Sequence, residues 1–178
     1  MVARTVDLRS DTVIKPTESM RTAMANAEVD DNVLGKDPTA LRLEKEMAKI
    51  MGKEADLFVP SGTMGNLISV LVHYDIRGSE VNLGDNSHIH IYQNGGIATI
   101  GGVHPRTVKN NEDGTMDIDS IEAAVRDTKG ELVYPSTRLI CLENTHANCG
   151  GRCLPVEYVD SVGELAEKHG IKLHIDGA

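Results

Sequence analysis

The sequence predicts an α/β protein in which a central, mostly parallel β-sheet is flanked by helices. Helix-like and strand-like segments alternate along its 178 residues, which is the pattern of this fold class. The order strand, helix, strand between Arg138 and Asp176 indicates a βαβ crossover, and such crossovers join parallel strands. Aromatic residues make up only 3% of the chain, so the core must be built from aliphatic side chains and methionine.

The helices are predicted from capping residues that are followed by apolar side chains at helical spacing. Thr17 is a good N-cap, with Met20 and Met24 behind it. Asp37 is expected to cap the next helix, because Pro38 suits a first helical position. The expected helices lie within 17–27, 37–52, 61–72, 117–125 and 155–169, with a short helix between 87 and 100 and an extended polar segment at 7–16.

The strands are predicted as short apolar runs bounded by glycine, proline, asparagine or aspartate. They are expected at 55–59, 81–83, 103–108, 137–142 and 171–175. Ligands of open parallel sheets bind at the carboxyl ends of the strands. The sequence therefore directs attention to three segments that follow strands, at 60–66, 143–146 and 176–178.

The composition argues against several classes of function. The net charge is −9 and no run of Lys or Arg occurs, so no nucleic-acid partner is expected. No apolar stretch approaches the roughly 20 residues of a membrane span, and the first residues lack the apolar core of a signal peptide. Three cysteines cannot form a complete disulfide framework, which favours the reducing cytosol. The roles of Cys141, Cys149 and Cys153 stay open.

Several residues at the predicted carboxyl edge could bind a ligand. Gly62 and Thr63 lie where a strand turns into a helix, and free N–H groups there attract anions; an ordinary helix cap is the alternative. Asp176 ends a buried strand and could pair with a protonated ring nitrogen, or cap a following helix. His88 and His146 could stack on a flat cofactor or act as a base, and either could instead be structural.

An anion cradle, a strand-end aspartate and a histidine for a ring face together describe pyridoxal 5′-phosphate. The aspartate would keep the ring nitrogen protonated, so that the ring withdraws electrons from the substrate's Cα. A zinc site built on His146, Cys149 and Cys153 is not expected, because no convincing fourth ligand accompanies them. A cysteine–histidine nucleophile pair is not expected either.

Five short motifs follow one another along the whole chain. They are Asp-Leu-Arg-Ser-Asp-Thr-Val at 7–13, Gly-Lys-Asp-Pro-Thr at 35–39, Ser-Gly-Thr-Met-Gly-Asn at 61–66, Glu-Asn-Thr-His at 143–146 and His-Ile-Asp-Gly-Ala at 174–178. In this order they resemble the low-specificity L-threonine aldolases, especially the plant members. These are pyridoxal phosphate enzymes of the aspartate-aminotransferase type, fold type I.

The resemblance implies a role for each matching residue in binding the cofactor. Gly62 and Thr63 would bind the phosphate, His88 would stack on the pyridine ring, and Asp176 would pair with the ring nitrogen. Residues 1–178 would form an N-terminal segment and part of the cofactor-binding large domain, without the small C-terminal domain.

The resemblance also implies the reaction, which is the retro-aldol cleavage of L-threonine or L-allo-threonine to glycine and acetaldehyde. Ser10 would help to hold the substrate carboxylate, and His146 would lie near the substrate hydroxyl as a candidate base. Thr12 would lie near a structural monovalent or divalent cation. The family is typically a homotetramer, and the segment around Leu34 and Gly35 would reach a neighbour's site.

Some features depart from the family pattern. Leu34 stands where many relatives have Tyr, and Gln93 where many have Glu. The lysine that binds the cofactor covalently lies beyond the final motif in the family, so the chain is expected to be a fragment that is inactive alone. Lys172 is no good substitute, because about four residues of strand separate it from Asp176. The alternatives are a truncated, non-catalytic isoform that joins full-length subunits, or another lyase or racemase of this fold.

Overall fold

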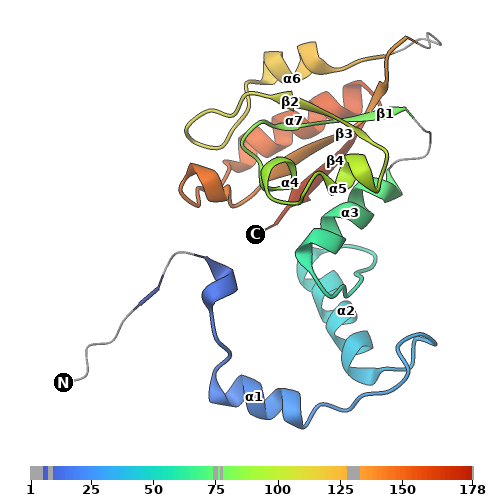
Figure 1. Cartoon of the computed structure of the whole chain (residues 1–178), viewed down its shortest axis with the longest axis vertical. Helices are drawn as coiled ribbons and strands as arrows, with labels where there is room; N and C mark the ends of the chain where they lie inside the picture. Colours follow the sequence, from blue (N-terminus) through green and yellow to red (C-terminus); the bar gives the residue numbers. More distant parts are fainter. Residues whose placement is uncertain (1–5, 8–9, 74–75, 77, 128–132, 178) are drawn as a thin grey trace. The chain divides into compact units, whose positions relative to one another are not determined.

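The computed structural model describes residues 6–7, 10–73, 76, 78–127 and 133–177 (Figure 1). The chain divides into two compact units, Met1–Phe58 and Val59–Ala178. No helix in the described ranges combines the length and the apolar character that a membrane crossing requires. That the 178 residues form an N-terminal segment and part of a large domain stays a prediction.

The first unit is helical. It contains the 3₁₀ turn η1 (Asp11–Val13) and the helices α1 (Glu18–Ala25) and α2 (Pro38–Met51). Thr17 caps α1 through its side chain, which accepts a hydrogen bond from the N–H of Met20. Asp37 caps α2, and Gly52 ends it in the left-handed conformation with φ of 61°. Both predicted starts are confirmed, because a cap is a local signal.

The predicted strand at 55–59 is wrong. The segment is not a strand in the structure, and Leu57 and Phe58 are 63% and 53% exposed. An apolar run becomes a strand only when its N–H and C=O groups find a neighbouring strand. Here the N–H of Phe58 instead donates to Glu44 Oε1 of α2. The extended segment expected at 7–16 is likewise interrupted, by η1.

The second unit is built on a four-stranded parallel sheet. The strands are β1 (Ser79–Gly84), β2 (His104–Val108), β3 (Ser136–Glu143) and β4 (Lys172–Asp176), in the spatial order β2-β1-β3-β4. All three pairings are parallel, as the predicted crossover requires. The carboxyl ends of the four strands therefore lie along one edge.

The helices of this unit connect and cover the strands (Figure 1). They are α3 (Gly62–Val72), α4 (His88–Ile91), α5 (Gly96–Thr99), α6 (Ile118–Ala124) and α7 (Val156–Lys168), with a 3₁₀ turn η2 (Ala147–Cys149) after β3. The short helix expected between 87 and 100 is two helices, α4 and α5, because Gly95 adopts a left-handed conformation between them.

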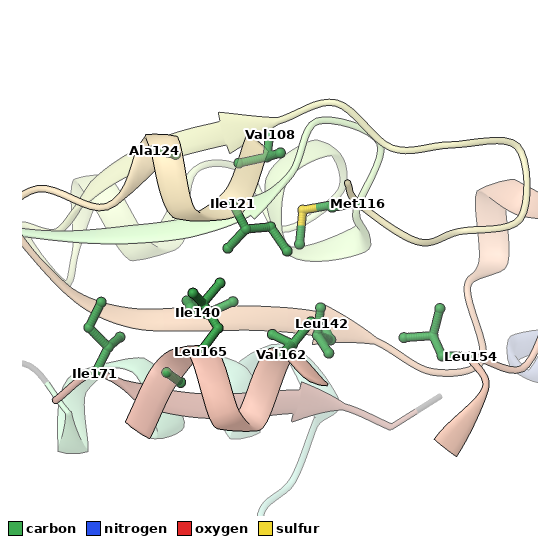
Figure 2. Close-up of a cluster of buried hydrophobic side chains, with 11 residues drawn as sticks. Val108, Met116, Ile121, Ala124, Ile140, Leu142, Leu154, Val162, Leu165 and Ile171 are labelled. Carbon is green, nitrogen blue, oxygen red and sulfur yellow. The ribbon is translucent and has the colours of Figure 1, made fainter. Parts of the chain in front are cut away.

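Two apolar clusters occupy opposite faces of the sheet. One packs Ile140 and Leu142 of β3 against Ile121 of α6 and Val162 and Leu165 of α7 (Figure 2). The other includes Val70 of α3 with alternating residues of the central strands, namely Val81, Leu83, Leu139 and Cys141. Since successive side chains of a strand point to opposite faces, this second face also receives every further odd-numbered residue of β3. The last residue of β3 that points to this face is Glu143.

Candidate functional site

The amino end of α3 offers free backbone N–H groups at the carboxyl edge of the sheet. Ser61 caps the helix, and its Oγ accepts a hydrogen bond from the N–H of Met64. The N–H of Gly65 closes the first helical turn on the Ser61 carbonyl. Helix geometry leaves the N–H groups of Gly62 and Thr63 without intrahelical acceptors. Both residues are exposed, and a Cβ at Gly62 would meet no atom within 4 Å, so an anion has room there.

A hydrogen bond between α3 and β4 places Asp176 on the same face of the sheet as this helix end. His174 Nε2 donates to Asn66 Oδ1 across 3.0 Å. Asp176 lies two residues further along the strand, so its side chain shares the face of His174. Burial lowers the pKa of His174, and His73 lowers it further, whereas the Asp176 carboxylate raises it. The imidazole beneath Asp176 is therefore kept neutral more readily than an exposed one.

Two carboxylates end neighbouring strands in register. Glu143 of β3 pairs with Asp176 of β4, and the N–H of Asn144 donates to the Asp176 carbonyl across 2.9 Å. Partners in a parallel register point to the same face. Glu143 is only 4% exposed, whereas Asp176 is half-buried. Of the two side chains, that of Asp176 is the one that a ligand reaches more easily.

His88 begins α4 directly beside the end of β3. Its backbone N–H donates to Glu143 Oε2 across 2.7 Å. Its ring contacts Tyr92 with centroids 5.4 Å apart, and its Nδ1 lies 3.2 Å from Gln93 Nε2. An amide nitrogen only donates, so Nδ1 is the acceptor and the hydrogen of the neutral ring sits on Nε2. The ring is half-buried and restrained on two sides.

His146 follows β3 but lies inside the protein. Its side chain is 1% exposed, and neither ring nitrogen has a hydrogen-bond partner among the residues that the structure describes. Nε2 lies 4.0 Å from Glu143 Oε2. A Cβ at Gly114 would come within 2.8 Å of His146 Cβ, so the glycine makes room for this side chain. The peptide bond between Asn144 and Thr145 just before it is cis.

The donor set on this face matches a flat, phosphorylated ligand with a basic ring nitrogen. The first turn of α3 supplies N–H donors for a phosphate, and Asp176 supplies a carboxylate for a protonated nitrogen. His88 supplies an aromatic face beside them, through the link of its backbone to Glu143. The residues present therefore fit the cofactor that the motifs imply. Which residues do bind it stays a prediction.

Ser10 and Thr12 belong to the first unit. Their hydroxyl oxygens lie 2.9 Å apart, and the Ser10 hydroxyl also donates to Asp11 Oδ1 across 3.2 Å. Within the described part of the chain, no group of three or more His, Cys, Asp or Glu side chains is arranged to hold a metal ion. A substrate contact at Ser10 and a cation near Thr12 stay predictions. Leu8, Arg9 and Ala178 of the motifs lie outside the described residues.

The cysteines do not pair with one another. Cys141 is buried in the face that carries Glu143, and burial with the nearby Asp176 charge raises the pKa of its thiol far above the ordinary value. Cys149 is half-buried, and its thiol lies 3.6 Å from the Asn111 carbonyl; Cys153 is exposed. Cys141 is thus an inert core residue at neutral pH.

Three residues of the site have no role in the sequence-based prediction, although each lies in a motif. They are Asn66, His174 and Glu143. A signal for Glu143 was present, since it ends a strand just as Asp176 does. No sequence signal pairs Asn66 with His174, because the two are 108 positions apart and meet only when α3 packs on β4.

The fold and the geometry of its edge together define a class: a parallel α/β protein with a candidate ligand site at the carboxyl edge of its sheet. The family model of the beta-eliminating lyases matches residues 7–178, and the chain belongs to this family. It is 80% identical over 175 residues to the probable low-specificity L-threonine aldolase 2 of Arabidopsis thaliana, and 77% identical over 178 residues to the low-specificity L-threonine aldolase 1 of the same plant. The resemblance to plant threonine aldolases is confirmed.

These relatives are longer than the chain. The alignments cover 98% and 100% of the chain but 49% and 50% of the two Arabidopsis proteins, so the chain spans about half the length of the curated relatives it matches. Among solved structures, a Listeria monocytogenes protein matches with a TM-score of 0.69 and 24% identity over 91% of this chain and 44% of its own. The Leishmania major threonine aldolase matches with a TM-score of 0.66 and 22% identity, and the match covers 79% of this chain and 40% of the Leishmania chain. Both matches confirm the predicted fold.

Proposed function

We propose that this chain recognises pyridoxal 5′-phosphate and serves the retro-aldol cleavage of L-threonine and L-allo-threonine to glycine and acetaldehyde. The observation that carries the proposal is the convergence of the α3 amino end, Asp176 and His88 on one face of one sheet edge, in a chain 77–80% identical to plant low-specificity L-threonine aldolases. An activity on amino acids with a hydroxyl at Cβ follows from those relatives' names.

When bound, the cofactor supplies an electron-withdrawing ring that stabilises negative charge at the substrate's Cα. The chain's own residues hold that ring in place. The N–H groups of Gly62 and Thr63 bind the phosphate at the positive end of α3. Asp176 keeps the ring nitrogen protonated, and the half-buried imidazole of His88 covers one ring face. The phosphate and the nitrogen are thus bound by groups on separate elements, which fixes the ring's orientation.

Two further residues are proposed to contact the substrate. Ser10 holds the substrate carboxylate, which orients the Cα–Cβ bond for cleavage. His146 accepts the proton of the β-hydroxyl as that bond breaks and acetaldehyde forms. The described part of the structure gives neither ring nitrogen a hydrogen-bond partner, so the nitrogen that carries no hydrogen in the neutral ring is free to take up a proton. A structural cation near Thr12 is a further proposal.

The physiological setting is proposed from the family resemblance of the motifs, and the cytosol from the odd number of cysteines. Cleavage of threonine would serve threonine catabolism and supply glycine, in the cytosol, by a homotetramer. The reaction also requires a lysine that binds the cofactor covalently. Lys172 of β4 is four residues from Asp176, which is about 13 Å of strand, so it does not reach the cofactor ring.

The proposal is tested by co-expressing this chain with the C-terminal half of Arabidopsis low-specificity L-threonine aldolase 1. Acetaldehyde is measured by coupled reduction and glycine by mass spectrometry, with pyridoxal phosphate and L-threonine present. We expect both products, and we expect Asp176→Asn to abolish them. A pair that binds the cofactor but forms no acetaldehyde contradicts the proposed reaction, and racemised or β-eliminated products assign it to another lyase or racemase of this fold.

The chain alone is tested with pyridoxal phosphate by absorbance, borohydride reduction and mass analysis. We expect no reduced adduct at a single lysine. A specific adduct contradicts the argument that no lysine of this chain serves the cofactor. A non-catalytic isoform predicts that the chain assembles with the full-length Arabidopsis subunit without adding activity, which size-exclusion chromatography and the same assay decide.

A further inference from the structure

We propose that Glu143 is a positioning residue that holds both His88 and His146 at the carboxyl edge of the sheet. This inference rests on the proposed function, because that function gives the two histidines their roles. The sequence motif contains Glu143 but assigns it no task. The structure assigns one through the contacts of its carboxylate.

Each oxygen of the Glu143 carboxylate accepts a hydrogen bond from a different loop. Oε2 accepts from the N–H of His88 across 2.7 Å, and Oε1 accepts from the N–H of Ala147 across 2.8 Å. The first donor begins α4 and the second begins η2, so one side chain ties both segments to the end of β3. Hydrogen bonds to a carboxylate are short and strong, and Glu143 is only 4% exposed, so water competes little for these two.

For His88, the carboxylate fixes the backbone while neighbouring side chains restrain the ring. Gln93 lies 3.2 Å from Nδ1, and the Tyr92 ring lies against the imidazole. Both of these residues follow His88 on the same short segment, and the Tyr92 hydroxyl also donates to Asn148 Oδ1 of η2 across 2.9 Å, which links two loops but not the strand itself. The bond from the His88 N–H to Glu143 links the segment to the strand, because Glu143 belongs to β3.

For His146, the same carboxylate lies within ion-pair distance of the ring. Oε2 lies 4.0 Å from Nε2, and the described structure gives neither ring nitrogen a hydrogen-bond partner. When the imidazole takes a proton from a substrate hydroxyl, the hydroxyl oxygen keeps the electron pair of its O–H bond and the positive charge forms beside Glu143. A buried imidazolium without such a neighbour would be strongly disfavoured.

The two carboxylates at the strand ends differ in their contacts and burial, and we infer different roles for them. Glu143 and Asp176 are register partners on one face. The carboxylate of Glu143 is committed to two N–H groups and is buried, whereas that of Asp176 is half-buried. Glu143 therefore positions the two loops by binding their backbone, and Asp176 is the carboxylate that contacts the ligand.

The test compares Glu143→Gln with wild type in the purified ¹⁵N-labelled protein. Ring signals of the histidines are recorded in long-range ¹H–¹⁵N spectra, and binding of pyridoxamine 5′-phosphate, which has no aldehyde and needs no lysine, is measured by calorimetry. We expect the signals of His88 and His146 to move and the affinity to fall about tenfold or more, since a buried acceptor is lost. His169, which bonds to Glu122, is the internal reference.

The matched control is Glu80→Gln, another buried glutamate, which bonds to Arg126 and Thr137 near the start of β1 and β3. It should lower stability without moving the signals of His88 and His146. Glu143→Gln spectra identical to wild type at both histidines overturn the inference. If Glu143→Gln does not fold, Glu143→Asp decides: undiminished affinity overturns the inference, because the shorter side chain cannot reach both N–H groups. Failure of wild type to bind the probe contradicts the proposed function, and the ring signals still decide the role of Glu143.

Discussion

His174 of β4 donates a hydrogen bond to Asn66 of α3 across 3.0 Å, and the two residues stand 108 positions apart in the sequence. This contact joins the helix whose first turn is the proposed phosphate cradle to the strand that ends in Asp176. Asn66 is 7% exposed, so water cannot replace the bond easily. The contact fixes the distance between two proposed cofactor-binding groups, and it makes their spacing sensitive to a single side chain.

Replacing Asn66 with Ala should destabilise the fold, because the Nε2–H of the half-buried His174 loses its acceptor. We expect the free energy of unfolding to fall by about 1–3 kcal/mol, measured by urea denaturation. Asn111→Ala is the control, since the bond from Asn111 to Thr115 is exposed and its loss should change stability by less than about 0.5 kcal/mol. Equal effects of the two variants would contradict a structural role for the bond between Asn66 and His174.

His174 should make the protein less stable as the pH falls. Its pKa in the folded state is lowered, first by burial, so the unfolded chain binds a proton that the folded chain does not. The stability contributed by the neutral imidazole is therefore complete above the ordinary histidine pKa near 6.5 and is lost as the pH falls through that value toward the lowered one.

The measurement is the urea midpoint at pH 7.5 and at pH 5.5 for wild type and His174→Gln. Glutamine stays neutral and keeps an N–H for Asn66, so the variant should lose less stability on acidification than wild type does. The difference between the two proteins isolates His174 from the other histidines. A wild-type decrease no larger than that of the variant would contradict the claim that the half-buried His174 stays neutral in the folded protein.

Gly114 should be intolerant of a side chain, because His146 occupies the space. Gly114→Ala places a Cβ within 2.8 Å of His146 Cβ and puts alanine at φ of 88°. We expect a loss of about 1–3 kcal/mol of stability and moved ring signals of His146. Gly170→Ala is the matched control, since its φ is 67° but no atom lies within 4 Å of the added Cβ. Gly170→Ala should lose stability through the same backbone strain, but the ring signals of His146 should not shift. A shift of these signals in both variants would contradict the packing argument.

Leu83 should be a major contributor to the apolar cluster beneath the site. It is fully buried on the central strand β1, on the face that carries Glu143. Leu83→Ala leaves a cavity, and we expect the unfolding free energy to fall by about 2–5 kcal/mol. The exposed Leu41 of α2 provides the control, whose replacement by Ala should cost less than half as much. A small effect at Leu83 would show that the cluster relaxes around the cavity.

The elements that the sequence predicts best are those with local signals. Thr17, Asp37 and Asp117 each cap a helix at the expected position, because a side-chain acceptor three residues before its donor acts within one turn. The strand at 55–59 fails for the opposite reason. A strand needs a partner elsewhere in the chain, and the residue pattern there does not report whether one exists.

In the candidate site too, local signals were predictable and contacts between distant residues were not. Asp176 lies in a motif at a strand end, and Gly62 lies in a motif at a helix start, although the strand predicted before it at 55–59 is absent. His88 lies in none of the five motifs, and its role comes from the family resemblance. The structure brings the three elements to one edge. The strand-end position of Glu143 marks it as a candidate site residue, but its task could not be predicted, because its partners are backbone N–H groups that carry no sequence signature. The burial of His146 likewise depends on the turn at Gly114, which is 32 positions away.

The central claim is that this chain recognises a pyridoxal cofactor without a covalent bond, and calorimetry with pyridoxamine 5′-phosphate tests it most directly. The account predicts saturable binding to wild type, at least tenfold weaker binding to Asp176→Asn because the charge on the ring nitrogen loses its partner, and unchanged binding to Asp160→Asn, an exposed aspartate of α7. Binding that is equally tight in Asp176→Asn and wild type would contradict it.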